Sequence, residues 1–346
     1  MTNQPFQAKK PLAKKSLLIS KVLLLLGIAL IGGCGKANTP AGQPNIQNET
    51  AAASAPQNAA PYPRVLSVNG QDVTIPTKPE RIAALSLDAA EAVLELVDPY
   101  RIAVVPKSAG DRFLAYRTEE AGKVEHQIAG ATSLDPEQVL SYNADLLIMT
   151  KLHDKEKEAN DILQQSGIPI ITLEAWNTLE AVMNNIVTIG KAVGEEQKAE
   201  AIVAEMKVKA GKIAQAVEGA AKPSVLVVSP LGPGTGPYII GSSNISYDIV
   251  RLAGATNAAD HLGLIRTTKA SIEQMIKADP EYILLVEWQE RTTDLEEMTQ
   301  NPGWSALQAV KNNKVKHMPA KQLLNPNRYN ADTLEEIAKW LHPDRF

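Results

Sequence analysis

EQVLSYNADLLI, residues 137–148, recurs without a gap as EQMIKADPEYIL, residues 273–284. Each copy predicts a short amphipathic helix, then a polar break, then an apolar strand. Because the segment occurs once in each half of the chain, it predicts two similar lobes, with a surface glutamate at the same place in each. The constant offset pairs Glu137 with Glu273 and Asp145 with Glu281.

The composition is that of an ordinary globular protein of about two domains. The chain has 346 residues, of which 44% are hydrophobic and 21% are charged. A net charge of -4 argues against a nucleic-acid-binding protein. The single cysteine, Cys34, excludes an intrachain disulfide. The five histidines are scattered without the spacing of a metal cage, so we expect no metal site and no resident cofactor.

Residues 1–33 are predicted to be a signal peptide. Lysines precede a short apolar run, VLLLLGIALI, residues 22–31, and two glycines separate that run from Cys34. An uncleaved membrane anchor is the alternative, but Lys21 interrupts the apolar stretch and its core is shorter than a spanning helix. Residues 34–63 contain almost no large apolar side chains, which predicts a flexible tether.

The remaining chain predicts two α/β lobes, each around a mainly parallel sheet. Strands and helices alternate in residues 64–178 and again in residues 220–346. Residues 179–219 form a helical connector, in which one apolar stripe over 195–217 predicts a helix of about 33 Å. We expect this helix to be a stiff strut that permits only small hinge movements. Asp88 is the expected N-cap of the first helix of the first lobe.

Five segments of the chain carry a resemblance to a known family. Their order and spacing are similar to those of the iron-complex and cobalamin substrate-binding proteins of ABC importers. The resemblance implies two lobes joined by one long rigid helix, with the ligand held in a cleft between the lobes. The segments are IPTKPERIAALS (75–86), SLDPEQVLSYNADLLI (133–148), RLAGATNAAD (251–260), ASIEQMIKADPEYILL (270–285) and NPGWSALQAVKNNKV (301–315).

The resemblance also implies partners and a location. Glu137 and Glu273 match the family positions that dock onto arginines of the membrane permease. Ile31-Gly32-Gly33-Cys34 resembles the lipobox of bacterial lipoproteins, which implies a lipid on Cys34. We therefore expect a monomer anchored by lipid on the extracytoplasmic face of the cell membrane, at the cell surface or in the periplasm.

Candidate ligand contacts are basic or aromatic side chains near strand ends, where open α/β sheets bind ligands. Basic groups pair with carboxylate or hydroxamate oxygens, and aromatic rings cover an apolar face, so we expect a large, polar, anionic ligand. Leu87, Asp88 and Thr150 are further candidates near the strand ends of the first lobe. The contacts predicted in the first lobe are Lys107, Arg112, Lys151 and Trp176, and those in the second are Tyr238, Arg266, Trp288, Arg328 and Tyr329.

The sequence favours a binding protein that delivers an iron-siderophore complex to a permease. Haem and cobalamin are alternatives, and Tyr116, His153 and Tyr329 are candidate haem axial ligands. A zinc or manganese receptor would need several histidine and carboxylate ligands. A tethered enzyme is disfavoured because no G-x-S-x-G or Walker motif is present. The loop PLGPGTGPY, residues 230–238, lacks the spacing of a phosphate-binding loop, so we interpret it as a turn at the cleft rim.

Overall fold

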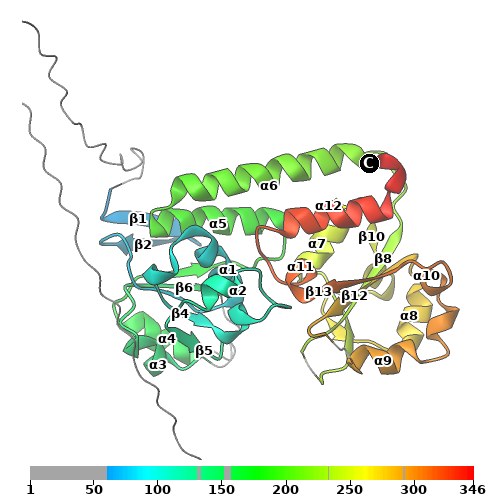
Figure 1. The fold of residues 1–346 in the computed structure, drawn as a ribbon, viewed down its shortest axis with the longest axis horizontal. Helices are drawn as coiled ribbons and strands as arrows, with labels where there is room; N and C mark the ends of the chain where they lie inside the picture. Colours follow the sequence, from blue (N-terminus) through cyan, green and yellow to red (C-terminus); the bar gives the residue numbers. More distant parts are fainter. Residues whose placement is uncertain (1–60, 131–133, 152–156, 233, 291–292) are drawn as a thin grey trace, which may run out of the picture. The chain divides into compact units, whose positions relative to one another are not determined.

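The computed structural model describes residues 61–130, 134–151, 157–232, 234–290 and 293–346, all within one compact unit (Figure 1). The predicted signal peptide, Cys34 and His153 lie outside the described residues. Across the described ranges, none of the helices combines the length and the apolarity that crossing a membrane requires.

The first lobe is built on a five-stranded parallel sheet in the order β5-β4-β3-β6-β7. Its central strands are runs of buried aliphatic residues, as expected for a parallel sheet covered on both faces. The strands are β3 (Ile82–Ala84), β4 (Ile102–Pro106), β5 (His126–Ile128), β6 (Leu146–Thr150) and β7 (Ile170–Leu173). The helices are α1 (Leu87–Leu96), α2 (Thr118–Ala121), α3 (Pro136–Ser141) and α4 (Lys157–Gln165).

An antiparallel hairpin precedes this sheet. Its strands, β1 (Arg64–Val68) and β2 (Gln71–Ile75), are joined through Asn69 and Gly70. Both turn residues have positive φ, 54° and 75°, which is the backbone that an Asn-Gly hairpin turn requires. Tyr62, just before β1, donates a hydrogen bond to the carbonyl of Ala192, so the packed body already includes this residue.

The second lobe contains a six-stranded, mainly parallel sheet in the order β11-β9-β8-β12-β13, with β10 beside β8. Strands β8, β10, β12 and β13 are parallel, whereas β9 and β11 run antiparallel to their neighbours. The strands are β8 (Ser224–Pro230), β9 (Pro237–Ile239), β10 (Thr256–Asn257), β11 (Thr268–Lys269), β12 (Tyr282–Glu287) and β13 (Val315–Pro319). The helices are α7 (Ile245–Leu252), α8 (Ile272–Ala278), α9 (Thr293–Thr299), α10 (Gln308–Lys311), α11 (Ala320–Leu323) and α12 (Asn330–Leu341).

The repeat in the sequence is a repeat in the fold. The carboxylate of Asp145, just before β6, accepts the backbone N–H of Arg81 at 3.0 Å, just before β3. The carboxylate of Glu281, just before β12, accepts the backbone N–H of Ser224 at 3.1 Å, at the start of β8. The same device therefore joins β3 to β6 in one lobe and β8 to β12 in the other.

The connector predicted for residues 179–219 consists of two antiparallel helices. Helix α5 (Leu179–Val193) turns at Gly194, whose φ of 75° suits glycine, into α6 (Glu196–Ala216). The apolar stripe of α6 is buried as predicted, and α6 packs first along α5 and then along α12 (Figure 1). Because α12 ends the second lobe, α6 spans both lobes, as the predicted strut does.

Candidate functional site

The carboxyl ends of the parallel strands of both lobes lead to the boundary between the lobes. The segment after β4 meets the segments after β12 and β13 there. The Nη2 atom of Arg112 lies 2.8 Å from Oε2 of Glu290, and the backbone N–H of Lys321 donates to the carbonyl of Phe113 at 2.8 Å. Because ligands of open α/β sheets bind at this edge, the boundary is the candidate ligand cleft.

In the first lobe, three strand ends form a cluster of polar side chains around Asp88. Helix α1 begins after Ser86, so the expectation that Asp88 is its N-cap is wrong. Instead, Oδ1 of Asp88 accepts hydrogen bonds from the hydroxyl of Thr150 and the N–H of Ala89, both at 2.8 Å, and from the hydroxyl of Ser86. The indole N–H of Trp176 donates to the Thr150 hydroxyl at 2.9 Å. Burial raises the pKa of the Asp88 carboxyl, and the bonds from Ser86 and Thr150 oppose that rise.

The second lobe carries a counterpart of this indole. The indole N–H of Trp288, directly after β12, donates to the hydroxyl of Ser229 at 2.9 Å. Ser229 is fully buried near the end of β8, and its own hydroxyl donates to the carbonyl of Pro230 at 2.7 Å. The two indoles differ in exposure: Trp288 is half-buried, whereas Trp176 is only 4% exposed. Trp176 is therefore a core residue under the cleft, in contrast to its predicted role as a ring that covers the ligand.

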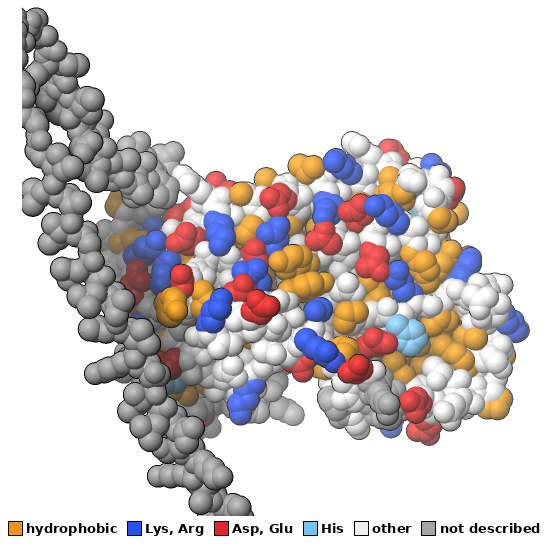
Figure 2. Space-filling view, in the orientation of Figure 1, with side chains coloured by type: hydrophobic (Ala, Val, Ile, Leu, Met, Phe, Trp, Pro, Cys, Tyr) orange, Lys and Arg blue, Asp and Glu red, His pale blue; other side chains and the backbone are white. Residues whose placement is uncertain are grey.

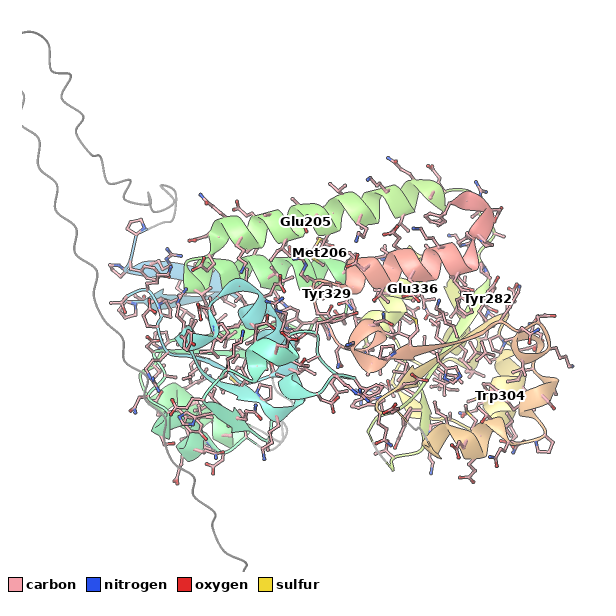
Figure 3. All side chains as sticks on the ribbon, viewed as in Figure 1. Glu205, Met206, Tyr282, Trp304, Tyr329 and Glu336 are labelled. Carbon is pink, nitrogen blue, oxygen red and sulfur yellow. The ribbon has the colours of Figure 1, made fainter. Side chains whose placement is uncertain are left out.

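Arg328 and Tyr329 lie in the packed junction of the lobes. Arg328 forms ion pairs with Glu95 of α1 at 3.0 Å and with Glu205 of α6 at 2.6 Å. The ring of Tyr329, at the start of α12 and below Glu205 in Figure 3, lies 4.3 Å from the ring of Tyr116 between centroids. The space left at this junction is about 10 Å³, which is far too small for a metal complex. The structure thus places these two predicted ligand contacts among side chains that join the lobes.

Tyr116 is held tightly at the same junction. Burial raises its pKa to about 12, which disfavours the phenolate that would serve as a haem axial ligand. The backbone N–H groups of Tyr116 and Arg117 both donate to the buried carboxylate of Glu91, at 2.9 and 3.0 Å. Glu91 therefore fixes the segment of the first lobe that meets the second.

The other predicted basic contacts are exposed. Lys107 follows β4, and Arg266 lies just before β11; neither side chain has a hydrogen-bonding or ionic partner among the described residues. Lys151 follows β6 and lies 4.0 Å from Glu174. Tyr238 lies in β9, opposite Ser229 of β8. These side chains remain available to a ligand at strand ends.

The polar residues that organise both edges were missed by the search for basic and aromatic side chains. Ser86, Ser229 and Glu290 all lie at or after the carboxyl end of a strand. A hydroxyl at the end of a buried apolar run was the signal that could have identified the two serines. Nothing in the sequence marks Glu290 as the partner of Arg112.

A groove of about 740 Å³ lies away from these strand ends, between α6 and α12. Val208, Ile213 and Phe346 contribute its apolar lining. Figure 2 shows acidic and basic side chains mixed over the face that carries these helices. We do not place the ligand there, because the groove has no strand-end polar groups. In the part of the chain that the structure describes, no three histidine, cysteine or acidic residues are grouped to hold a metal ion.

The paired glutamates occupy equivalent places. Glu137 and Glu273 are the second residues of α3 and α8, and both are exposed. The pKa of Glu273 is lowered by hydrogen bonds from its own backbone N–H and from Ser271, so it is a carboxylate at neutral pH. Each lobe therefore presents one negative charge at the start of a short helix, a position that the helix dipole favours.

Comparison with known proteins identifies the scaffold. The model of the family described as periplasmic binding protein matches residues 82–322, which include both sheets. The chain belongs to the periplasmic binding protein family. It is therefore a solute-binding protein and not an enzyme. The family resemblance, the two-lobed fold and the absence of enzymatic activity that were predicted from the sequence are confirmed.

Three similar proteins illustrate the family. An uncharacterised ABC transporter substrate-binding lipoprotein of Bacillus subtilis, YvrC, is 26% identical over 338 residues, which cover 93% of this chain and 96% of that protein. A cobalamin-binding protein of Halobacterium salinarum is 28% identical over 218 residues, covering 61% of this chain and 55% of that protein. The periplasmic heme-binding protein RhuT of Roseiflexus has a TM-score of 0.65 at 20% identity, covering 77% of this chain and 99% of that one, and shows the fold alone.

Proposed function

We propose that the chain is the extracytoplasmic substrate-binding protein of an ABC importer, and that it captures a preformed metal complex and delivers it to the permease. An iron-siderophore complex is the first candidate, and a corrinoid is the rival. The proposal rests on one observation above the others. Two similar sheets direct their carboxyl ends at one boundary, and each lobe also carries an exposed glutamate at an equivalent helix start.

The side chains around the boundary support a large ligand of mixed character. Trp288 offers a half-buried ring that is fixed by Ser229, and Tyr238 of β9 lies opposite Ser229 in the sheet. Exposed Lys107 and Arg266 offer unpaired positive charges for ligand oxygens. A metal complex held by its own chelator combines an apolar face with such oxygens, and it needs no metal ligands from the protein.

Two of the similar proteins support the same class of ligand. One relative is named a cobalamin-binding protein, and one protein of the same fold is named a heme-binding protein. Both ligands are large metal complexes. A corrinoid is the stronger rival to an iron chelate, since haem binding needs an axial ligand and the half-buried Tyr116 is stacked on Tyr329 in the lobe junction, where its pKa is raised.

Thermal unfolding of the purified full chain tests this proposal. A ligand that binds only the folded state stabilises it by RT ln(1 + [L]/Kd), or about 2.7 kcal/mol at a hundredfold excess over Kd. We expect stabilisation by a ferric trihydroxamate, ferric citrate, haemin or cyanocobalamin, and none by zinc or manganese ions. Stabilisation by a free ion alone, or by no metal complex at all, would contradict the proposal.

A lipid on Cys34 would hold the protein at the membrane, as the name of the Bacillus subtilis relative implies for that protein. We expect Cys34→Ala to abolish incorporation of a labelled fatty acid and to leave the precursor unprocessed. Cys34→Ser should give the same result, because it also lacks the thiol while it keeps a side chain of similar size. Equal labelling of the wild type and both variants in a metabolic labelling experiment would refute the anchor.

A further inference from the structure

We propose that Asp88 is a hydrogen-bond acceptor for the ligand on the first-lobe side of the cleft, and that it selects a metal complex whose periphery carries N–H donors. This inference rests on the proposed function and adds to it the chemistry of the ligand. Complexes with amide or ammonium groups have such donors, whereas haem and ferric citrate present carboxylates at their edges.

The two carboxyl oxygens of Asp88 accept hydrogen bonds unevenly. The hydrogen bonds from Ser86, Thr150 and Ala89 all end on Oδ1. No hydrogen bond from another described residue reaches Oδ2, and this oxygen is also absent from the buried side-chain atoms that lack a partner. Asp88 is half-buried, and its own backbone N–H also bonds to the carboxylate, so Oδ2 keeps a lone pair that no donor from another described residue occupies.

The surrounding hydrogen bonds hold the Asp88 carboxylate in one orientation. The indole N–H of Trp176 donates to the Thr150 hydroxyl, and this hydroxyl donates in turn to Oδ1. The backbone N–H of Thr150 also donates to the Ser86 hydroxyl at 3.3 Å, which points its own proton at Oδ1. The three donors that other residues supply to the carboxylate thus all end on Oδ1, and Trp176 and the Thr150 backbone orient two of them. The carboxylate is fixed before the ligand arrives, which lowers the entropy cost of binding.

The Asp88 carboxyl lies at the carboxyl-end edge of the first-lobe sheet. Ser86 follows β3, Thr150 ends the neighbouring strand β6, and Asp88 lies in the first turn of α1, so the cluster lies at the edge that faces the lobe boundary. An anionic edge of a ligand would be repelled there by a carboxylate held in a poorly solvated place. An N–H group would satisfy Oδ2. The exposed charges of Lys107 and Arg266 are left for the chelator oxygens.

The test is calorimetric titration of the full chain with four probes. Cyanocobalamin carries amide N–H groups and ferrioxamine B carries an ammonium group, whereas ferric citrate and haemin carry carboxylates. We expect one of the first two to bind more tightly than either of the last two. Asp88→Asn keeps the shape of the side chain but turns an acceptor into a donor, so it should weaken that complex by about ten- to a hundredfold. Glu218→Gln, an exposed change beyond the end of α6, should leave the affinity unchanged.

The ligand itself provides a second measurement that needs no variant. Acetylation of the ferrioxamine ammonium, or conversion of one cyanocobalamin amide to a carboxylate, should weaken binding to the wild-type protein by about tenfold in at least one derivative. A preference for ferric citrate or haemin, or equal affinities in Asp88→Asn and the wild type, would overturn the inference while the proposed function stands. Binding of none of the four complexes would instead count against the proposed function.

Discussion

Ligand uptake is expected to fall by about tenfold or more when Glu137 and Glu273 are both changed to alanine, while ligand affinity stays as in the wild type. Tenfold corresponds to about 1.4 kcal/mol, which two charge contacts with a permease readily supply. Both glutamates are exposed and lie in the first turn of the helices that precede β6 and β12, outside the segments that follow β3, β4, β6, β8, β12 and β13 at the candidate cleft. The measurement is uptake in cells beside calorimetry on the purified protein.

Glu180 is a matched control for this pair. It is exposed and is the second residue of α5, so Glu180→Ala removes the same favourable contact with a helix start. It has no counterpart in the repeat, and we expect normal uptake. Loss of uptake in Glu180→Ala as large as in the double variant would assign the effect to helix stability. Normal uptake in the double variant would remove the permease contact.

The salt dependence of the complex gives an independent check. Exposed charge pairs are screened over about 10 Å at 0.1 M ionic strength. Binding of the wild-type protein to permease in detergent or nanodiscs should therefore weaken as salt rises. The double variant should show a flatter dependence, because its two docking charges are gone.

Much of the fold was predictable because the sequence contains the same helix–strand pattern in each of the two lobes. The gapless repeat fixed the pairing of Glu137 with Glu273, and the structure places both at the second position of a helix. The buried strands were predicted from continuous aliphatic runs, and α6 from one apolar stripe. These signals are local, since each follows from neighbours in the chain.

The site was harder to predict because its contacts join distant parts of the chain. Arg328 looked like a free cation near a strand end, but its partners Glu95 and Glu205 come from two other helices. No pattern around Arg328 indicates them. The N-cap of α1 was also misplaced, because serine and aspartate are both good caps and here stand two residues apart. Hydrogen bonds from Ser86 and Thr150 at the strand ends, rather than capping preference, decided the role of Asp88.

Trp176→Ala is expected to lower the free energy of unfolding by about 3–5 kcal/mol, the usual range for deleting a buried tryptophan side chain. The ring is 4% exposed, belongs to the hydrophobic core cluster that runs through both lobes, and anchors Thr150 through its indole N–H. Its loss leaves a cavity and removes a donor from the cluster around Asp88. Denaturant unfolding of the full chain, read as the shift in midpoint at constant slope, gives the change.

Two variants separate this structural role from contact with ligand. Trp176→Phe keeps most of the packing and loses the hydrogen bond, so it should cost only about 1–2 kcal/mol. Trp288→Ala removes the half-buried ring of the second lobe, and we expect a smaller loss of stability than for Trp176→Ala with a larger loss of ligand affinity. The alternative has a clear signature: if Trp176→Ala unfolds like the wild type yet loses ligand as Trp288→Ala does, both indoles contact the ligand. The difference matters for the cleft, because a ring in the core positions Thr150 and Asp88, whereas a ring at the surface would compete with them for the same ligand edge.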